Sequence, residues 1–290
     1  MEEIRKKTRL TQQYLLPLKK PHDRPEGYNI YPSHPLNDEE IFCDNEKLAQ
    51  EFLNHRLVMV DGYQGVFFED FRAELDSVLR ALDVQPRWIS TLEMLKSAEE
   101  IDLMIQPFLG GDDPLFGSRA TISLEDFFDE SQLKSVGINP NDRLTIIYGP
   151  GASLASADGF LVYIDIPKNE IQFRARAQSV SNLGAVSPYD AKAMYKRFYF
   201  VDWVVLNHHK QKIWSKIQII IDGQRPGHWV WAKGYTIRNG LRTMSHNAFR
   251  VRPWFEPGVW GGEWIKGKID GLNKNVANYA WSFELIVPEN

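Results

Sequence analysis

The sequence predicts an α/β protein with a mostly parallel sheet, followed by a short antiparallel β segment. Apolar runs of the buried-strand type end at turn residues, and segments with helical periodicity lie between them. Strands that alternate with helices usually form a parallel sheet covered on both faces. Beyond residue 250 the chain becomes rich in Trp, Gly and Pro, which is typical of turn-bounded antiparallel strands. We therefore expect two parts, with a boundary near 248–253.

Four strands of the parallel sheet are predicted, because each apolar run is closed by residues that favour a turn. The first two cover 57–60, closed by Asp-Gly, and 143–148, closed by Gly-Pro-Gly. The other two cover 160–166, closed by Pro, and 216–221, closed by Asp-Gly.

Helices are predicted between and after these strands. Apolar residues recur at helical spacing in 68–82, which gives a helix with one buried face. The segments 190–214 and 235–247 are also expected to be helical. Residues 1–40 contain five prolines and little periodicity, so we expect an extended arm that docks on the folded domain.

Length and composition indicate a folded chain of one to two domains, with 290 residues of which 43% are hydrophobic. The net charge of −4 gives no electrostatic reason to expect nucleic-acid binding. No apolar run approaches the roughly 18–20 residues of a membrane-spanning helix, so we expect no membrane partner. The single cysteine, Cys43, excludes an intrachain disulfide and fits a cytoplasmic protein. We expect Cys43 to be a small buried hydrophobic residue rather than a reactive thiol.

The order of elements in residues 55–225 resembles that of P-loop nucleoside kinases of the uridine kinase type. The strand and turn at 58–65 lie where the phosphate-binding loop would be, which makes Asp61, Gly62 and Gly65 candidate phosphate-binding residues. The segment 145–149 looks like the strand that ends in a Glu-Gly pair in those kinases. The segment 161–165, followed by Arg174 and Arg176, looks like the next strand and its arginine-bearing lid. The resemblance implies a doubly wound, P-loop-kinase-like domain over 41–250.

The phosphate loop departs from the pattern that phosphoryl transfer requires. A working loop follows Gly-x-x-x-x-Gly-Lys-Ser/Thr, in which the lysine reaches the β- and γ-phosphates and the hydroxyl binds magnesium. Here Val66-Phe67-Phe68 follows Gly65, without the lysine or the hydroxyl. Acidic Glu69-Asp70 follows at the electropositive start of the helix, and Tyr148 replaces the acidic residue before Gly149. We therefore expect a degenerate loop.

Longer phrases resemble a group of bacterial class I mannose-6-phosphate isomerases that carry a kinase-like region ahead of the isomerase barrel. These phrases are 61–72, 110–117, 195–203 and the Trp-Gly-Gly turn at 260–262. Residues 251–290 resemble the opening strands of that cupin-type barrel. The resemblance implies that this chain is the non-catalytic N-terminal region of a protein that interconverts mannose 6-phosphate and fructose 6-phosphate.

The same resemblance implies a zinc site outside this chain. In the family, zinc is held by Gln-x-His, Glu and His, which follow the opening strands. No Gln-x-His occurs here, and the adjacent pair His208-His209 would point about 100° apart on a helix. We therefore expect no metal and no cofactor in this chain, and we expect the metal-binding part to lie beyond residue 290.

Two further groups are candidates for ligand binding. Asp112 and Asp113 in a glycine-rich loop, with Arg119 nearby, could coordinate magnesium or orient a hydroxyl, or could form an ordinary Asp-Pro turn. Arg174 and Arg176 could face one phosphate if they lie on a loop. On a helix they would splay apart and belong to ordinary surface.

Three functions remain open at this point. The chain is a scaffold, a sugar-phosphate- or nucleotide-binding module without turnover, or an active P-loop-type kinase of nucleosides or sugars. A phosphorylated small molecule is the expected partner of the second and third. The aromatic-rich tail 253–290 should pack back on the α/β domain or pair with the tail of a second chain, which would give a homodimer.

Overall fold

A computed structural model describes most of the chain. The described residues are 8–10, 36, 40–113, 116–137, 139–156, 158–246, 251–257 and 279–285. Their contacts divide the chain into two compact units. The first unit comprises Met1–Gln13 and Glu39–Gly234, and the second comprises Tyr14–Asp38 and Tyr235–Asn290.

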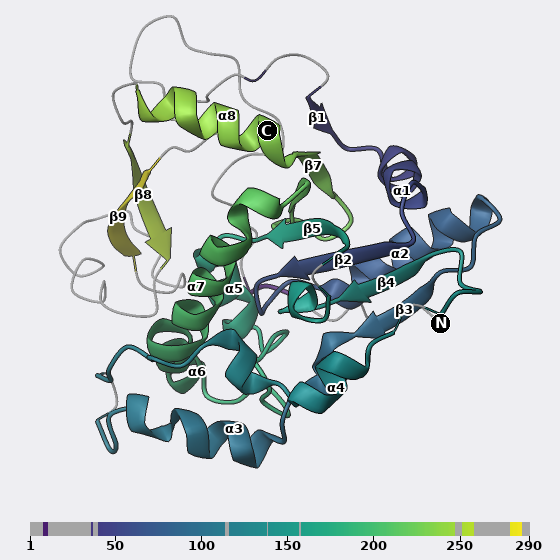
Figure 1. Cartoon of the computed structure of the whole chain (residues 1–290). Helices are drawn as coiled ribbons and strands as arrows, with labels where there is room; N and C mark the ends of the chain where they lie inside the picture. The colour runs from purple at the N-terminus through teal and green to yellow at the C-terminus, as the bar shows by residue number, and fades with distance from the viewer. Residues whose placement is uncertain are drawn as a thin grey trace, which may run out of the picture. The chain divides into compact units, whose positions relative to one another are not determined.

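The first unit is built on a seven-stranded mixed sheet in the order β1-β7-β6-β5-β2-β4-β3 (Figure 1). The neighbouring pairs from β3 to β6 are parallel, and β7 and β1 complete one edge in antiparallel pairing. The mostly parallel α/β sheet predicted from the sequence is therefore confirmed. The strands are β1 (Ile41–Phe42), β2 (Leu57–Gly62), β3 (Arg87–Ser90), β4 (Thr145–Tyr148), β5 (Phe160–Asp165), β6 (Ile219–Asp222) and β7 (Val230–Lys233).

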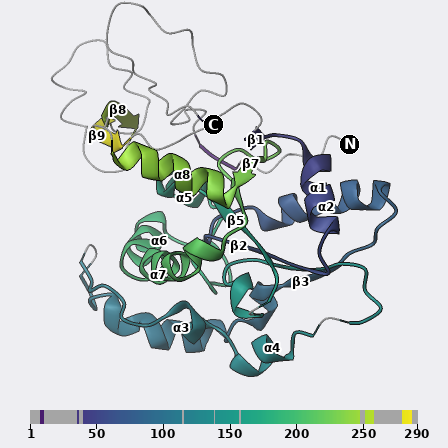
Figure 2. The same ribbon diagram turned by 45° about the horizontal axis from the view of Figure 1, so that its top comes forward.

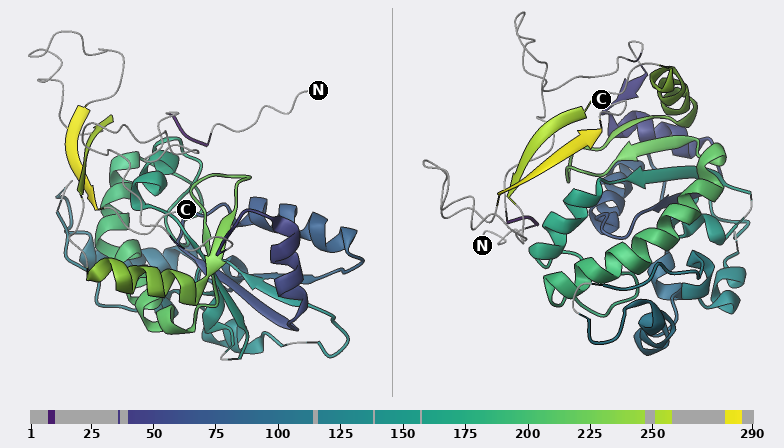
Figure 3. Two further views of the ribbon diagram at one scale, coloured as in Figure 1. Left: turned by 90° about the horizontal axis from the view of Figure 1, so that it is seen from above. Right: turned by 90° about the vertical axis from the view of Figure 1, so that its left-hand side faces the viewer.

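Helices cover both faces of this sheet. In Figures 2 and 3, α1 and α2 lie on one face, and α3, α4, α6 and α7 lie on the other. The helices of this unit are α1 (Asn45–Leu53), α2 (Phe68–Ala81), α3 (Ala98–Ile105), α4 (Glu130–Ser135), α5 (Lys168–Arg176), α6 (Ala191–Arg197) and α7 (Trp203–Ile213). A π-helical turn at Phe198–Asp202 joins α6 to α7, and a 3₁₀ turn at Trp214–Lys216 follows α7.

The strands at the centre of the sheet are apolar because both of their faces are covered. Every residue of β2 and β4 is buried, and only the last residue of β5 is partly exposed. Such continuous burial is characteristic of parallel strands between two helical layers. Since β2 pairs with β4 on one side and β5 on the other, it occupies the middle of the parallel part.

The order in which the chain adds strands to the sheet changes sides at β2. The strands β3 and β4 lie on one side of β2, and the later strands β5 and β6 lie on the other. In open α/β sheets, ligands bind outside the carboxyl ends of the strands at such a switch point. The turn after β2 is therefore the place to look for a site.

The long apolar segments were predicted well, and the short elements were missed. The four predicted strands correspond to β2, β4, β5 and β6, and the predicted helices correspond to α2, to α6 through α7, and to α8 (Gly234–Ser245). The sequence did not predict β1, β3, β7 or the helices α1, α3 and α4. The missed strands are only two to four residues long and carry partly exposed residues, so their periodicity is weak. The missed helices are short, with six to nine residues each.

The second unit contains α8 and an antiparallel pair, β8 (Val251–Pro257) with β9 (Tyr279–Leu285). Antiparallel strands were predicted for this part of the chain. The compact units divide after Gly234, whereas the boundary predicted from composition lies near 248–253. The turn at 260–262 lies outside the described residues, as does the predicted arm over 1–40 except for 8–10, 36 and 40.

Cys43 is exposed, so the expectation of a buried cysteine was wrong. Cys43 directly precedes the N-cap residue of α1, in a connection that leaves the sheet.

Within the described ranges, none of the helices has the length and apolar character needed to cross a membrane.

Replacing Gly62 with alanine should destabilise the sheet. A Cβ at Gly62 would lie 2.5 Å from the carbonyl oxygen of Ile164 on β5, so the two strands would have to separate. Overpacking of this kind costs about 1–3 kcal/mol. We expect a melting temperature several degrees below that of the unchanged protein. Gly137→Ala is the control, because nothing lies closer than 4.0 Å to its added Cβ; equal melting temperatures for the two variants would contradict the close approach.

Candidate functional site

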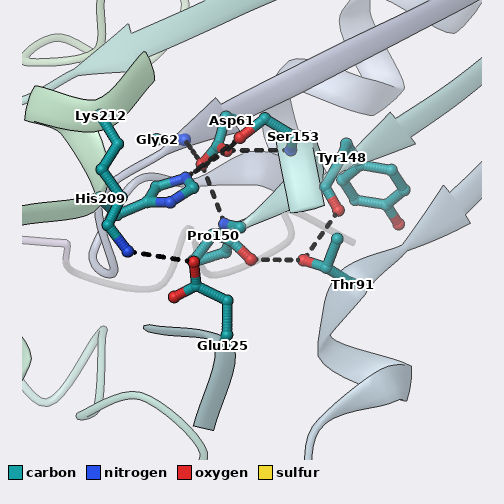
Figure 4. A network of polar contacts seen from close by, with 10 residues as sticks. Asp61, Gly62, Thr91, Glu125, Tyr148, Pro150, Ser153, His209 and Lys212 are labelled. Atoms are coloured by element: carbon teal, nitrogen blue, oxygen red, sulfur yellow. Dashed lines mark hydrogen bonds and ion pairs between the residues drawn. The ribbon is translucent and has the colours of Figure 1, made fainter. Parts of the chain in front are cut away.

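The carboxylate of Asp61, at the carboxyl end of β2, is the centre of a buried polar network (Figure 4). Its Oδ1 accepts hydrogen bonds from the backbone N–H groups of Gly62 at 2.7 Å and Gly151 at 2.9 Å. Its Oδ2 accepts from the N–H of Ser153 at 3.0 Å and from the hydroxyl of Ser153 at 2.7 Å. His209 Nε2 on α7 lies 2.8 Å from the same oxygen. The fully buried carboxylate is thus surrounded by donors.

Two of these donor residues, Gly151 and Ser153, come from the turn that follows β4. Gly149 and Gly151 both have positive φ, which glycine adopts without strain, and they turn the chain into a short 3₁₀ helix at Ala152–Leu154. The N–H groups of its N-cap residue, Gly151, and of Ser153 donate to Asp61, whereas that of Ala152 donates to Gly149 O. The Thr91 hydroxyl donates to Pro150 O at 2.9 Å and holds the turn.

Asp61 is held in its charged form by this arrangement. Burial alone would raise the pKa of the carboxyl group, but the charge and hydrogen bond of His209 and the hydrogen bonds of Ser153 outweigh burial, so the pKa lies below its usual value. A carboxylate only accepts hydrogen bonds, so Nε2 of His209 carries the proton that faces it.

The three residue types match those of a nucleophilic triad, but the geometry does not. In a Ser-His-Asp triad the serine and the aspartate contact opposite nitrogens of the imidazole. Here Ser153 Oγ at 3.1 Å and Asp61 Oδ2 at 2.8 Å both contact Nε2 of His209. A proton taken from the serine cannot be relayed through the ring in this arrangement. The network therefore anchors the end of β2 to α7 and to the turn after β4.

The loop after β2 is filled by the side chain of Arg174, which comes from α5. The guanidinium is fully buried and donates to Gly65 O at 2.7 Å. It also donates to Gly223 O at 2.9 Å and Gln224 O at 3.0 Å, in the turn after β6. Its Nε donates to Glu170 at 3.1 Å. The N–H groups of Arg174, which the sequence analysis considered as donors to a bound anion, therefore donate to groups of the protein itself.

The helical form of α5 decides between the two alternatives for the arginine pair. Arg174 lies over the ring of Phe67 at 4.1 Å, within the protein. Arg176 is half-buried, donates to Gln172 at 3.2 Å and lies over Phe173. The two side chains splay apart, because positions i and i+2 of a helix point in different directions. The structure does not bring them together at one anion.

The start of α2 carries its own negative charge. Glu69 in the first turn accepts a hydrogen bond from the hydroxyl of Tyr148 at 2.6 Å and pairs with Arg72 at 2.7 Å. Burial, followed by the hydrogen bond to Glu69, raises the pKa of Tyr148 to about 12. An acidic side chain at this position complements the helix dipole, as a bound phosphate would.

The glycine-rich loop with Asp112 and Asp113 is separate from this network. Asp113 accepts a hydrogen bond from the N–H of Phe116 at 2.8 Å, and its carbonyl oxygen accepts from Lys196. Asp112 and Arg119 are exposed. The contacts are those of an aspartate-stabilised turn, which was the simpler of the two alternatives. Within the described residues, no group of three or more His, Cys, Asp and Glu side chains could hold a metal ion.

The structure therefore joins Asp61, Gly62, Gly65 and Arg174 at one edge of the sheet. Sequence reasoning missed Ser153 and His209. The adjacent histidines were noticed, but they were considered only as metal ligands. The available signal was the Gly-Pro-Gly turn after a buried strand, because that turn predicts free N–H groups beside the neighbouring strand end.

A family model described as a domain of unknown function (DUF8485) matches residues 44–246, and the chain belongs to this family. No curated protein matches the chain. One similar solved structure is a putative fructose transport system kinase from Silicibacter sp. TM1040, with 13% identity, a TM-score of 0.38, and coverage of 57% of this chain and 94% of that one. Another is shikimate kinase from Bacteroides thetaiotaomicron, with 13% identity, a TM-score of 0.30, and coverage of 66% and 97%.

Replacing Asp61 with asparagine should destabilise the first unit at neutral pH by about 1.5–3 kcal/mol, the usual contribution of hydrogen bonds to a charged group. The folded-state pKa of Asp61 lies below its usual 3.8, so its stabilisation is present above that pH and is lost as the pH falls through the folded value. Thermal melts of both proteins should therefore differ at pH 7 and converge in acid. Asp158→Asn, at an exposed site, is the control; a pH-independent difference would contradict a charged Asp61.

Proposed function

We propose that residues 41–250 form a P-loop-kinase-like domain that has lost phosphoryl transfer. It acts as a scaffold or ligand-binding domain in a protein of the mannose-6-phosphate isomerase type. The observation that carries the loss of transfer is the buried guanidinium of Arg174. It is bonded to Gly65 O inside the loop that would hold phosphate. A phosphate loop works by presenting N–H groups and a lysine to the anion, whereas this loop presents a carbonyl oxygen to an internal cation.

The order of the strands supports a P-loop-kinase-like arrangement. The strand before the loop, β2, lies between β4 and β5, and the loop leads directly into α2. The order of elements along residues 55–225 resembled that of P-loop nucleoside kinases, and the order of the strands within the sheet supports the same resemblance. It also puts the degenerate loop at the switch point, where nucleotides bind in doubly wound sheets.

The residues that replace the catalytic ones support the loss of activity. Val66, Phe67 and Phe68 stand in place of the lysine and hydroxyl; Val66 and Phe68 are buried, and Phe67 packs against the core. Ile171 comes within 3.1 Å of the position that a Cβ on Gly65 would occupy, so apolar side chains pack closely around the loop. No lysine can enter this space without displacing part of the core.

The relation to mannose-6-phosphate isomerases rests on the sequence phrases at 61–72, 110–117, 195–203 and 260–262. The antiparallel pairing of β8 with β9 is compatible with the first strands of a cupin-type barrel. In this proposal, zinc and the isomerase chemistry belong to residues outside this chain.

Magnesium-ATP should neither bind nor be hydrolysed. Calorimetry with Mg-ATP on the full chain should give no heat of binding, and a nucleoside or sugar should yield no phosphorylated product. Arg174→Met should lower the free energy of unfolding by about 3–5 kcal/mol, because it breaks a buried charge pair with Glu170. Arg176→Met, on the same helix and half-buried, should cost much less.

Three outcomes would contradict the proposal. Magnesium-dependent ATP binding that a Gly65→Asp change weakens would show that the loop still holds phosphate. Turnover of a nucleoside or sugar would make the chain an active kinase. An effect of Arg174→Met on ATP affinity without a loss of stability would also assign the guanidinium to a ligand.

The chain should contain no stoichiometric zinc and should not isomerise mannose 6-phosphate, since it lacks the Gln-x-His donor pair. Metal analysis of the purified protein, with a coupled isomerase assay, checks both expectations. About one zinc per chain, together with isomerisation that a chelator abolishes, would refute this part of the proposal.

A further inference from the structure

A second polar site lies beside the filled loop, on one face of α7. Trp203, Asn207, Lys210 and Trp214 are spaced at i, i+4, i+7 and i+11, so their side chains share a face of this helix and the 3₁₀ turn after it. That face contacts the end of β5 and the loop after β2. Lys210 Nζ lies 2.6 Å from a carboxylate oxygen of Asp165, and the Tyr63 hydroxyl donates to Asn207.

This face borders an open pocket. A cavity of about 360 Å³ is lined by Lys210, Gln211 and Trp214. Its volume lies within the range of roughly 300–1,000 Å³ that is usual for small-molecule sites. The ammonium group of Lys210 is 5.6 Å from the ring centre of Trp214, so a cation and an aromatic wall border the same space.

A second ammonium group lies near that of Lys210. Lys168, the first residue of α5, is close enough to Lys210 to be affected by its charge. Partial burial lowers the pKa of Lys168, the nearby Lys210 lowers it further, and Asp165 partly opposes both. Asp165 pairs with Lys210 and also interacts with Asp222. Two ammonium groups close together can attract an anion.

Buried polar atoms next to the two lysines also lack partners within the described residues. The hydroxyl of Tyr163 and Nε1 of Trp203 are buried and make no hydrogen bond. Tyr163 has its ring 5.3 Å from Lys210 Nζ, and Trp203 has its ring 5.8 Å from Lys168 Nζ. Buried polar groups are nearly always hydrogen-bonded in native proteins, so orphaned ones call for a ligand or ordered water.

We propose that this pocket binds a small phosphomonoester, with Lys210 contacting the phosphate, Lys168 adding positive charge nearby, and Trp214 packing on the organic group. A phosphate dianion matches two ammonium groups better than a carboxylate does, because its charge offsets both. A tryptophan face favours a flat or ring-shaped organic group. The two arginines considered in the sequence analysis take no part in this site.

This inference rests on the proposed function, in which the domain binds a ligand without phosphoryl transfer, and it names the class of that ligand. The two proposals can be tested separately. A chain that binds no phosphomonoester still fits a scaffold without phosphoryl transfer. A chain that hydrolyses ATP refutes the loss of transfer, whatever binds at Lys210.

The test is calorimetric titration of the full chain with four probes: inorganic phosphate, mannose 6-phosphate, phenyl phosphate and unphosphorylated mannose. We expect at least one of the two esters to bind more tightly than inorganic phosphate, and mannose not to bind. Lys210→Gln should weaken ester binding at least ~10-fold, the effect of losing one charge-assisted hydrogen bond. Trp214→Phe should weaken binding of the ester and leave that of inorganic phosphate nearly unchanged.

Lys212→Gln is the matched control. It removes the same charge from the same helix, but Lys212 is two positions beyond Lys210, on a different side of the helix, and pairs with Glu125 at 3.2 Å (Figure 4). Lys168→Gln is a second test variant, in case Lys210→Gln does not fold. The absence of ester binding at millimolar concentration would overturn the proposal. So would equal weakening by the Lys210 and Lys212 variants, or ester binding that neither Lys210→Gln nor Lys168→Gln weakens.

Discussion

The carboxyl edge of the sheet depends on the buried guanidinium of Arg174. A charge in the interior is tolerated only when its donors are satisfied, so Arg174 requires the carbonyl oxygens of Gly65, Gly223 and Gln224 in fixed positions. These oxygens belong to the loop after β2 and the turn after β6, on either side of β5. One side chain from α5 therefore ties together the ends of two strands that do not pair. Glu170 completes the arrangement by pairing with Arg174 at 3.1 Å and with Arg9 at 2.9 Å.

The same edge contains two regions with different chemical capacity. Around Asp61 and Arg174, donors and acceptors bond to one another within the protein. Around Lys210 and Trp214, the surface is open, a second ammonium group lies near Lys210, and buried polar atoms remain unbonded in the described residues. The carboxyl edge of the sheet therefore combines a region whose polar groups bond to one another with an open pocket beside it.

Sequence reasoning predicted the parallel core because that core has a strong local signal. The strands β2, β4 and β5 are continuous apolar runs ended by turn residues, and such runs retain their conformation in most buried contexts. The edge strand β3 was missed because Arg87 and its neighbours are partly exposed and do not alternate. Likewise α5 was left open between helix and loop. Its inward-facing residues include Glu170 and Arg174, so its apolar periodicity is weak.

The sequence by itself determined that the loop after β2 lacks the lysine and the hydroxyl of a working phosphate loop, because residue identity does not depend on folding. It also determined that the given sequence contains no Gln-x-His pair. Only the tertiary structure decided the roles of the charged residues that are present. Arg174 lies 109 positions from Gly65, and His209 lies 148 positions from Asp61. Whether such side chains bind a ligand or one another depends on long-range packing and on burial, which local periodicity does not encode.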